Sequence, residues 1–147
     1  MTLKFAYLLR FSLPAFFVIP FSTYHCFAET LISFKDGSQT KTEDLLARGK
    51  ALVYIERDCP VCHQYIQELA VCKESVKEKL QIVSVNTPAQ TKEMARKIPS
   101  DLPLYIVKGQ KVAKSLYATP TTRTRKTQKV GIQRCGDLEK LISAIQK

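Results

Sequence analysis

The stretch ALVYIERDCPVC at residues 51–62 decides the fold of this 147-residue chain. Its first five residues, Ala51 to Ile55, form a continuous apolar run, which is typical of a strand buried on both faces. Two cysteines, Cys59 and Cys62, follow within a few residues. From His63 to about Lys79 the apolar side chains recur at helical spacing, which predicts an amphipathic helix. The stretch therefore predicts a buried strand that leads through a cysteine pair directly into a helix.

The rest of the chain alternates strand and helix patterns. Apolar runs predict strands over residues 31–34, 80–85 and 102–107, and a hairpin over 122–126 and 129–132. Helices are predicted over 43–48 with Thr42 as the cap and Gly49 as the stop, over 89–97 after Pro88, over 111–117, and at the end of the chain with Asp137 as the cap. This order predicts one α/β domain with a mixed sheet.

Residues 1–28 have the pattern of a secretory signal peptide. Lys4 and Arg10 supply the basic start, residues 11–21 are the apolar stretch, and Cys26-Phe27-Ala28 has small residues where a signal peptidase cleaves. The apolar stretch is short and contains two prolines, unlike a membrane span. We therefore expect cleavage after Ala28 and a periplasmic or otherwise secreted domain at 29–147, with an uncleaved membrane anchor as the alternative.

The domain is basic. Two of the 23 basic residues lie in the leader, which leaves 21 basic against 13 acidic residues. Such an excess favours an acidic partner or an anionic membrane face, although a soluble basic protein is the simpler interpretation. The sequence has no basic–aromatic repeat, so we expect no nucleic-acid partner. Four cysteines follow the leader, and exported proteins occupy compartments where disulfides persist.

The pair Cys59 and Cys62 has the setting that thiol–disulfide exchange needs. The attacking species is a thiolate, so a redox cysteine requires a lowered pKa. At the start of a helix, unpaired backbone N–H groups and the positive end of the helix dipole stabilise a negative sulfur. Pro60 fits the first helical turn, where its missing N–H costs little. The sequence predicts Cys59 as the nucleophile and Cys62 as the resolving cysteine; the residues expected to tune the pair are Pro60, Val61 and His63.

With this pair in place, the chain resembles the thioredoxin superfamily, especially the periplasmic thiol oxidoreductases related to TlpA and the Dsb proteins. The resemblance rests on ALVYIERDCPVC at 51–62, KVAKSLYATPTT at 111–122 and KVGIQRCGDLEKLI at 129–142, and spans roughly residues 30–147. It implies a thioredoxin-like three-layer α/β/α fold with a central mixed β-sheet. It also implies an exported oxidoreductase without metal or organic cofactor, which exchanges disulfides with protein substrates and with a redox partner protein that is often membrane-bound.

The family carries a cis-proline that faces the active cysteines, and the resemblance implies Thr119 and Pro120 as this substrate-binding site. A cis X–Pro bond is uncommon and is normally held for a reason. Pro103 is the competing position if the fold is a minimal thioredoxin. We prefer Pro120 because the segment before it matches the family more fully, which makes residues 88–117 an inserted helix, strand and helix.

Two positions depart from the family pattern. Asp58 stands where the family has a tryptophan, and Val53 stands where thioredoxin keeps a buried acid. Glu56 lies nearby in the sequence but is expected to point differently. The direction of electron flow, whether oxidation, reduction or isomerisation, therefore stays open, as does the identity of the substrate.

Cys72 and Cys135 are the other cysteines of the domain. Ten helical residues would place Cys72 about 15 Å from Cys62, too far for a disulfide unless the helix breaks. In the thioredoxin fold the helices near Cys72 and Cys135 pack on the same face of the sheet, so the resemblance makes a structural bridge between them one expectation. Two separate cysteines, or a Cys135 that relays electrons to the active pair, are the alternatives.

Three other functions match parts of the pattern. Cys59 to His63 also reads C-x-x-C-H, the attachment signature of c-type haem, with His63 as an axial ligand and Met94 as the only methionine after the leader. The strand patterns disfavour a small cytochrome, which is mainly helical. A four-cysteine zinc site would lack the usual second C-x-x-C. The third alternative is a non-catalytic binding module that holds partner chains in the groove beside Pro120.

Overall fold

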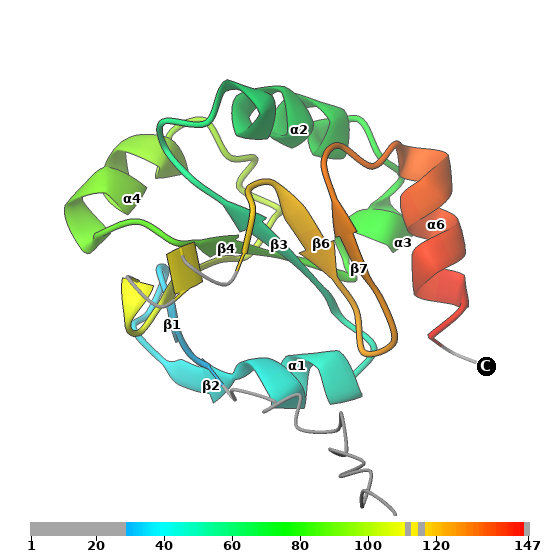
Figure 1. Ribbon diagram of the computed structural model, residues 1–147, viewed down its shortest axis with the longest axis horizontal. Coiled ribbons are helices and arrows are strands. Elements are labelled where there is room, and N and C mark those ends of the chain that lie inside the picture. Colours follow the sequence, from blue (N-terminus) through cyan, green and yellow to red (C-terminus); the bar gives the residue numbers. More distant parts are fainter. Residues whose placement is uncertain (1–28, 111–112, 115–116, 146–147) are drawn as a thin grey trace, which may run out of the picture.

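The computed structural model describes residues 29–110, 113–114 and 117–145 (Figure 1). The strands are β1 (Thr30–Ser33), β2 (Gln39–Lys41), β3 (Ala51–Ile55), β4 (Leu80–Ser84), β5 (Leu104–Val107), β6 (Thr121–Arg123) and β7 (Gln128–Val130). The helices are α1 (Thr42–Ala47), α2 (Pro60–Ala70), α3 (Glu74–Lys77), α4 (Pro88–Ala95) and α6 (Cys135–Ser143).

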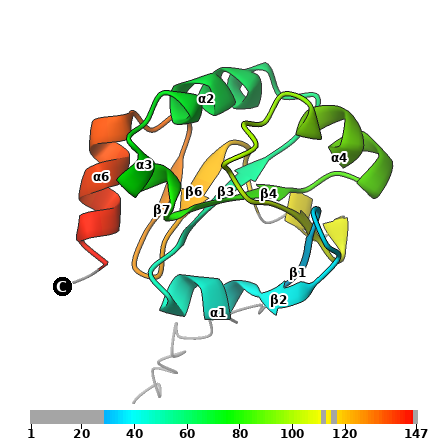
Figure 2. The same ribbon diagram turned by 180° about the vertical axis from the view of Figure 1, so that it is seen from behind.

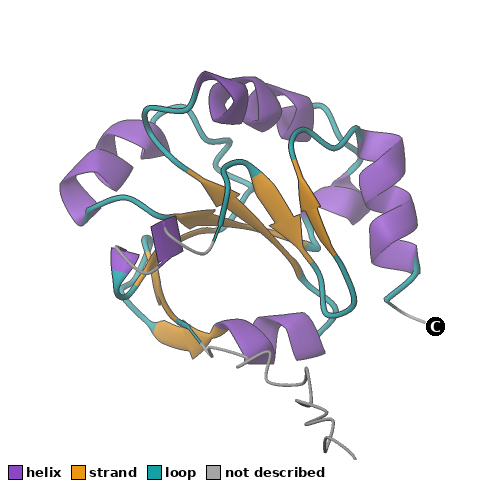
Figure 3. Ribbon diagram, in the orientation of Figure 1, coloured by secondary structure: helices purple, strands orange, loops and turns teal. Residues whose placement is uncertain are grey.

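The seven strands form one sheet in the order β2-β1-β5-β4-β3-β6-β7. The central strands β3, β4 and β5 are parallel, and the outer strands join antiparallel. Helix α1 lies on one side of the sheet, and α2 and α4 lie on the other (Figure 3). The prediction of a three-layer α/β/α fold with a central mixed sheet is therefore confirmed.

Strand β3 separates two apolar cores. Its side chains Ala51, Val53 and Ile55 face a core that α2, α3, α4 and α6 complete. Leu52 and Tyr54 face a second core that includes the leucines of α1. All five side chains are fully buried, which explains why the strand reads as an unbroken apolar run.

The structure differs from the predictions at three places. It contains strand β2, which the sequence does not predict because its residues are polar and mostly exposed; only its pairing with β1 identifies it as a strand. Thr42 is the first residue of α1 rather than its cap, and Lys41 holds the cap position without a side-chain hydrogen bond. Asp137 lies inside the first turn of α6, and Arg134 holds the cap position there.

The helix predicted from His63 to Lys79 is interrupted. α2 ends at Ala70 and α3 begins at Glu74, so Cys72 lies in the break. A disulfide joins Cys72 to Cys135 at the start of α6, with their Cα atoms 5.4 Å apart. Helices α3 and α6 lie side by side at this point (Figure 2).

Two predictions concern residues that the structure does not describe. The predicted leader at residues 1–28 lies entirely outside the described residues. Of the helix expected over 111–117, residues 111–112 and 115–116 lie outside them, while Ala113 and Lys114 are helical. Over the ranges that the structure describes, no helix combines the length and the apolar character that crossing a bilayer requires.

A buried polar cluster lies beside β3 on its α1 side. The Tyr54 hydroxyl donates a 2.8 Å hydrogen bond to Glu29 Oε2, and its ring stacks on Tyr117 with the centroids 4.0 Å apart. Arg123 of β6 donates to the Tyr117 hydroxyl at 3.1 Å and to a Glu43 carboxylate oxygen at 2.9 Å. Burial raises the pKa of Glu29 above its ordinary value of 4.5.

We expect Glu29→Gln to remove a pH dependence of stability. Because the pKa of Glu29 is higher in the folded protein than in the unfolded chain, its contribution is fully present below pH 4.5 and is lost as pH rises through the folded value. In urea titrations, the free energy of unfolding of the variant should therefore rise relative to that of the wild type as the pH increases from 4 to 8. A constant difference across that range would contradict this account.

The Cys72–Cys135 disulfide should carry much of the stability of the domain. It closes a chain separation of 63 residues, whereas Cys59–Cys62 closes only 3, and a longer loop restricts the unfolded chain more. We expect Cys72→Ala/Cys135→Ala to lower the free energy of unfolding by about 2–4 kcal/mol. The matched control, Cys59→Ala/Cys62→Ala, should lose clearly less in the same denaturant series; equal losses would refute the loop-length argument.

Candidate functional site

Cys59 lies where the chain from β3 enters α2. Its backbone is extended and occupies the cap position of the helix, and Pro60 is the first helical residue. The Cys62 amide donates a hydrogen bond to Cys59 Sγ at 3.0 Å. A disulfide joins the two cysteines, with the Cα atoms 5.2 Å apart. The predicted pair is thus brought together at a helix start, where backbone N–H groups stabilise negative charge on Cys59.

The two sulfurs differ in access. Cys62 is fully buried in the core on the α2 side, whereas Cys59 is only partly buried. Val61, between them, leaves 45% of its surface exposed. An incoming thiol or disulfide therefore meets Cys59 first, and Cys62 is reached only from inside the protein.

The Thr119–Pro120 loop faces the pair. Its peptide bond is the only cis bond among the described residues, so Pro103 does not have the cis geometry that the competing alignment required. The carbonyl oxygen of Thr119 lies 3.5 Å from Cys59 Sγ. The position follows from the sheet, because Thr121 pairs with Tyr54 of β3, and β3 leads into the cysteine turn.

A buried hydrogen bond ties α2 to the same loop. The Tyr65 hydroxyl of α2 and Thr122 Oγ1 of β6 are 2.7 Å apart. Burial raises the pKa of Tyr65 to about 12, so this hydroxyl stays neutral. The bond holds the helix that carries the cysteines against the strand that follows Pro120, and neither residue was singled out from the sequence.

His63 turns inward rather than into solvent. Its Nε2 lies 2.8 Å from the backbone oxygen of Arg57, and because a carbonyl only accepts, Nε2 carries the proton. Nδ1 is buried without a hydrogen-bond partner among the described residues. His63 thus fastens the first turn of α2 to the segment before the cysteines.

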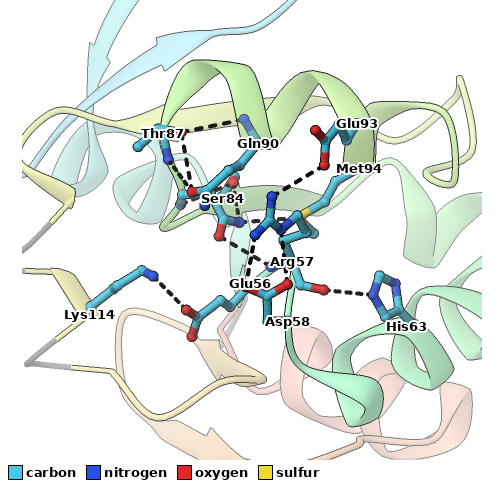
Figure 4. A network of polar contacts seen from close by, with 11 residues as sticks. Glu56, Arg57, Asp58, His63, Ser84, Thr87, Gln90, Glu93, Met94 and Lys114 are labelled. Atoms are coloured by element: carbon cyan, nitrogen blue, oxygen red, sulfur yellow. Dashed lines mark hydrogen bonds and ion pairs between the residues drawn. The ribbon is translucent and has the colours of Figure 1, made fainter.

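Charged side chains surround the turn before Cys59 (Figure 4). The Arg57 guanidinium donates to both oxygens of Asp58 at 2.9 and 3.1 Å, and to Glu93 of α4 at 3.3 Å. It lowers the pKa of Asp58. Glu56 forms an ion pair with Lys114. The exposed carboxylate of Asp58 is therefore compensated by a neighbouring cation.

The sequence did not reveal this network. Arg57 and Glu93 are 36 residues apart, and only the parallel placement of β3 and β4 brings α4 beside the turn. A second hydrogen bond joins the same turn to the segment after β4: the Arg57 amide donates to Asn86 Oδ1 at 3.2 Å. In the sequence, the alternating charges of Glu56-Arg57-Asp58 are the feature that could have pointed to this network.

The buried acid of thioredoxin has no counterpart beside Cys62. Val53 occupies that position in the apolar core. Over residues 29–110, 113–114 and 117–145, Glu29 is the only acidic residue with a buried side chain, and it lies on the opposite side of β3, bonded to Tyr54. The residues described here thus provide no buried carboxylate that could take a proton from Cys62.

The geometry does not suit haem or zinc. Haem attachment needs an available histidine nitrogen as axial ligand, but His63 Nε2 is bonded to the Arg57 carbonyl. Met94 is buried against the Asn86 amide, 3.1 Å from it. Cys72 and Cys135 form their own disulfide, so the four cysteines do not assemble into one metal site.

Comparisons identify the fold. No protein family model matches the chain, and no curated protein matches it by sequence. A thioredoxin-like protein from Bacteroides caccae superposes with a TM-score of 0.53 at 15% identity, over 80% of this chain and 47% of that protein, so this chain spans about half its length. An exposed lipoprotein thioredoxin from Streptococcus pneumoniae gives 0.59 at 13% identity, over 80% and 99%. The thioredoxin domain of a Bacteroides vulgatus thiol-disulfide oxidoreductase gives 0.57 at 15%, over 80% and 92%. The chain has the thioredoxin fold.

Charge variants beside Cys59 should shift its pKa in opposite directions. Removal of the cation in Arg57→Gln should raise the pKa of the Cys59 thiol in the reduced protein, and removal of the anion in Asp58→Asn should lower it. Each shift should stay below about one unit, because both side chains reach solvent. The ultraviolet absorbance of the thiolate against pH measures both.

The double variant Arg57→Gln/Asp58→Asn serves as the control. Because the two charges compensate each other, its Cys59 pKa should return close to that of the wild type. Shifts of the same sign in both single variants would show that the variants act by disturbing the turn rather than by charge.

Proposed function

We propose that this chain is an exported thiol–disulfide oxidoreductase that exchanges disulfides with protein substrates. The observation that carries the proposal is the Cys59–Cys62 disulfide at the start of α2, opposite the cis Thr119–Pro120 bond. A sulfur at a helix start with an amide donor is the arrangement that stabilises an attacking thiolate. Export is inferred from the leader pattern of residues 1–28.

The reducing direction proceeds in two exchanges. The Cys59 thiolate attacks one sulfur of a substrate disulfide, which forms a mixed disulfide and releases the other substrate sulfur as a thiolate. The Cys62 thiolate then attacks Cys59 Sγ, frees the first substrate sulfur and closes the Cys59–Cys62 disulfide. Two electrons pass to the substrate, and the same steps in reverse oxidise a substrate dithiol. A second dithiol or disulfide protein restores the starting state.

Each feature of the site has a part in these steps. The Cys62 amide stabilises the negative charge on Cys59 before attack and again when Cys59 leaves. Burial of Cys62 prevents a substrate from attacking the resolving sulfur. The backbone of Thr119, beside Cys59, is positioned to bind an extended substrate segment, as the resemblance implies. Pro60, Val61 and His63 adjust the potential through the helix turn that they form.

A non-catalytic binding module is the second candidate. The Thr119 backbone beside Cys59 supports it, but binding alone does not require two cysteines at disulfide distance. An apolar core in place of the buried acid leaves the pair without an internal proton acceptor, which is compatible with slow reduction or with use as an oxidant. The potential of the pair separates these uses: a value near −270 mV favours a reductant and one near −120 mV an oxidant.

Two cysteine variants test the proposal. Cys59→Ser should abolish the reduction of insulin disulfides by dithiothreitol and the oxidation of a reduced peptide. Cys62→Ala should keep attack but lose resolution, so that mixed disulfides with substrate accumulate and can be identified by mass. A binding module would keep its partner affinity in both variants and would show no exchange in the wild type.

A further inference from the structure

The segment that carries the cis-proline is free of acidic residues. Residues 102–136 hold eight of the 23 basic side chains and none of the 13 acidic ones. This segment includes the loop at Pro120 and the hairpin of β6 and β7. The excess of basic residues is therefore uneven along the sequence, although two of these cations, Lys114 and Arg123, pair with Glu56 and Glu43.

Strand β7 is an edge of the sheet. It pairs only with β6, and no strand adjoins its other side. All three of its side chains, Gln128, Lys129 and Val130, are exposed, and Val130 leaves 63% of its surface free. Unpaired edges accept an additional extended segment by backbone hydrogen bonds.

The register decides which backbone groups point outward. The Gly131 amide donates to Pro120 at 2.8 Å, and Thr127 accepts from the Thr124 amide at 2.8 Å. In an antiparallel pair, alternate residues face the partner strand. Residues 127, 129 and 131 therefore face β6, and the N–H and C=O groups of Gln128 and Val130 turn away from it.

The edge leads directly to the catalytic sulfur. Val130 pairs with Thr121, and the next residue, Gly131, is bonded to Pro120. The carbonyl of Thr119 lies 3.5 Å from Cys59 Sγ. A chain segment laid along the outer side of β7 toward this end would lie about two strand spacings, roughly 10 Å, from the loop that faces Cys59.

The cations of this edge lack acidic partners. Arg125, Lys129 and Arg134 are exposed, and within the described part of the chain none of them forms an ion pair. The charges at the turn before Cys59 are matched instead, since Arg57 pairs with Asp58 and Glu93. The β7 side thus presents cations that are not compensated in this way.

We propose that β7, together with Arg125 and Arg134, is a docking edge that selects substrates carrying an extended acidic segment beside their reactive cysteine. This rests on the proposed oxidoreductase function and names its substrate class. The backbone of Gln128 and Val130 binds the segment, Val130 supplies apolar contact, and Lys129 and Arg134 attract its carboxylates. Complementary charge raises association rates by roughly 10-fold or more at low ionic strength.

A protein segment fits this edge better than a second copy or a membrane. Two copies would bring Lys129 of one chain against the cations of the other, and like charges oppose pairing at an edge. A membrane surface would use the charges but not the outward backbone groups of a strand. The position beside Cys59 favours an occupant that itself carries a thiol or disulfide.

Chromogenic peptides test the proposal. Three synthetic peptides each carry one cysteine as a mixed disulfide with a chromophoric aromatic thiol, flanked by glutamates, glutamines or lysines. The Cys59 thiolate of the reduced full chain attacks the peptide sulfur and releases the coloured thiolate, and rates are normalised to uncharged dithiothreitol. We expect the acidic peptide to react about 10-fold faster than the glutamine peptide, and the lysine peptide slower. The preference should vanish at about 0.5 M salt.

Charge reversal at the edge provides the decisive comparison. Lys129→Glu/Arg134→Glu should reverse the preference, so that the lysine peptide reacts faster than the acidic one, and the circular dichroism of the variant shows whether it folds. The matched control, Lys35→Glu/Lys41→Glu, makes the same charge change at exposed residues near the opposite end of the sheet, and it should keep the preference for the acidic peptide.

The outcomes separate the two proposals. No reaction with any peptide would refute the oxidoreductase function itself. Equal rates with all three peptides, or a preference that Lys129→Glu/Arg134→Glu leaves intact, would overturn the docking edge alone. The docking edge would also be overturned if the wild type did not discriminate between the peptides but bound phosphatidylglycerol vesicles, or formed a dimer in sedimentation, and the variant lost that binding or that dimer.

Discussion

The hydrogen bond from the Cys62 amide to the Cys59 sulfur depends on how closely α2 follows β3. A fully buried central strand fixes the chain up to Ile55, and the helix begins at Pro60. The short turn between them therefore has little freedom, and the sulfur is held among the unpaired amides of the helix start. The hydrogen bonds of His63 to Arg57, and of Arg57 to Asn86, hold this turn from two sides.

Elements with buried side chains were the ones that the sequence predicted well. β3 and β4 each have an apolar pattern that follows from burial. The final hairpin was predicted as well, although the side chains of β7 are exposed. β2 and the break after Ala70 have no such pattern: β2 is polar and exists through pairing with β1, and the break lacks glycine and proline. The contacts of Arg57 with Glu93 and of Tyr65 with Thr122 join residues 36 and 57 positions apart, which spacing alone does not predict.

Two separate segments govern the surroundings of Cys59. If the proposed function holds, the turn at residues 56–58 affects reactivity, because its charges lie next to the sulfur in the chain. The hairpin would then affect access, because Gly131 is bonded to Pro120 and the Thr119 carbonyl lies 3.5 Å from Cys59 Sγ. Charge in one segment can therefore change without altering the other, and the two can be adjusted separately on one fold.

The two disulfides differ in how much of the chain each one holds. Cys59–Cys62 spans 3 residues at one helix start, whereas Cys72–Cys135 spans 63 residues and joins the break after α2 to the start of α6. If the Cys59–Cys62 bond opens and closes as the proposed function requires, the second bond still fastens α6 to the rest of the domain, so the opened chain loses little of its restraint.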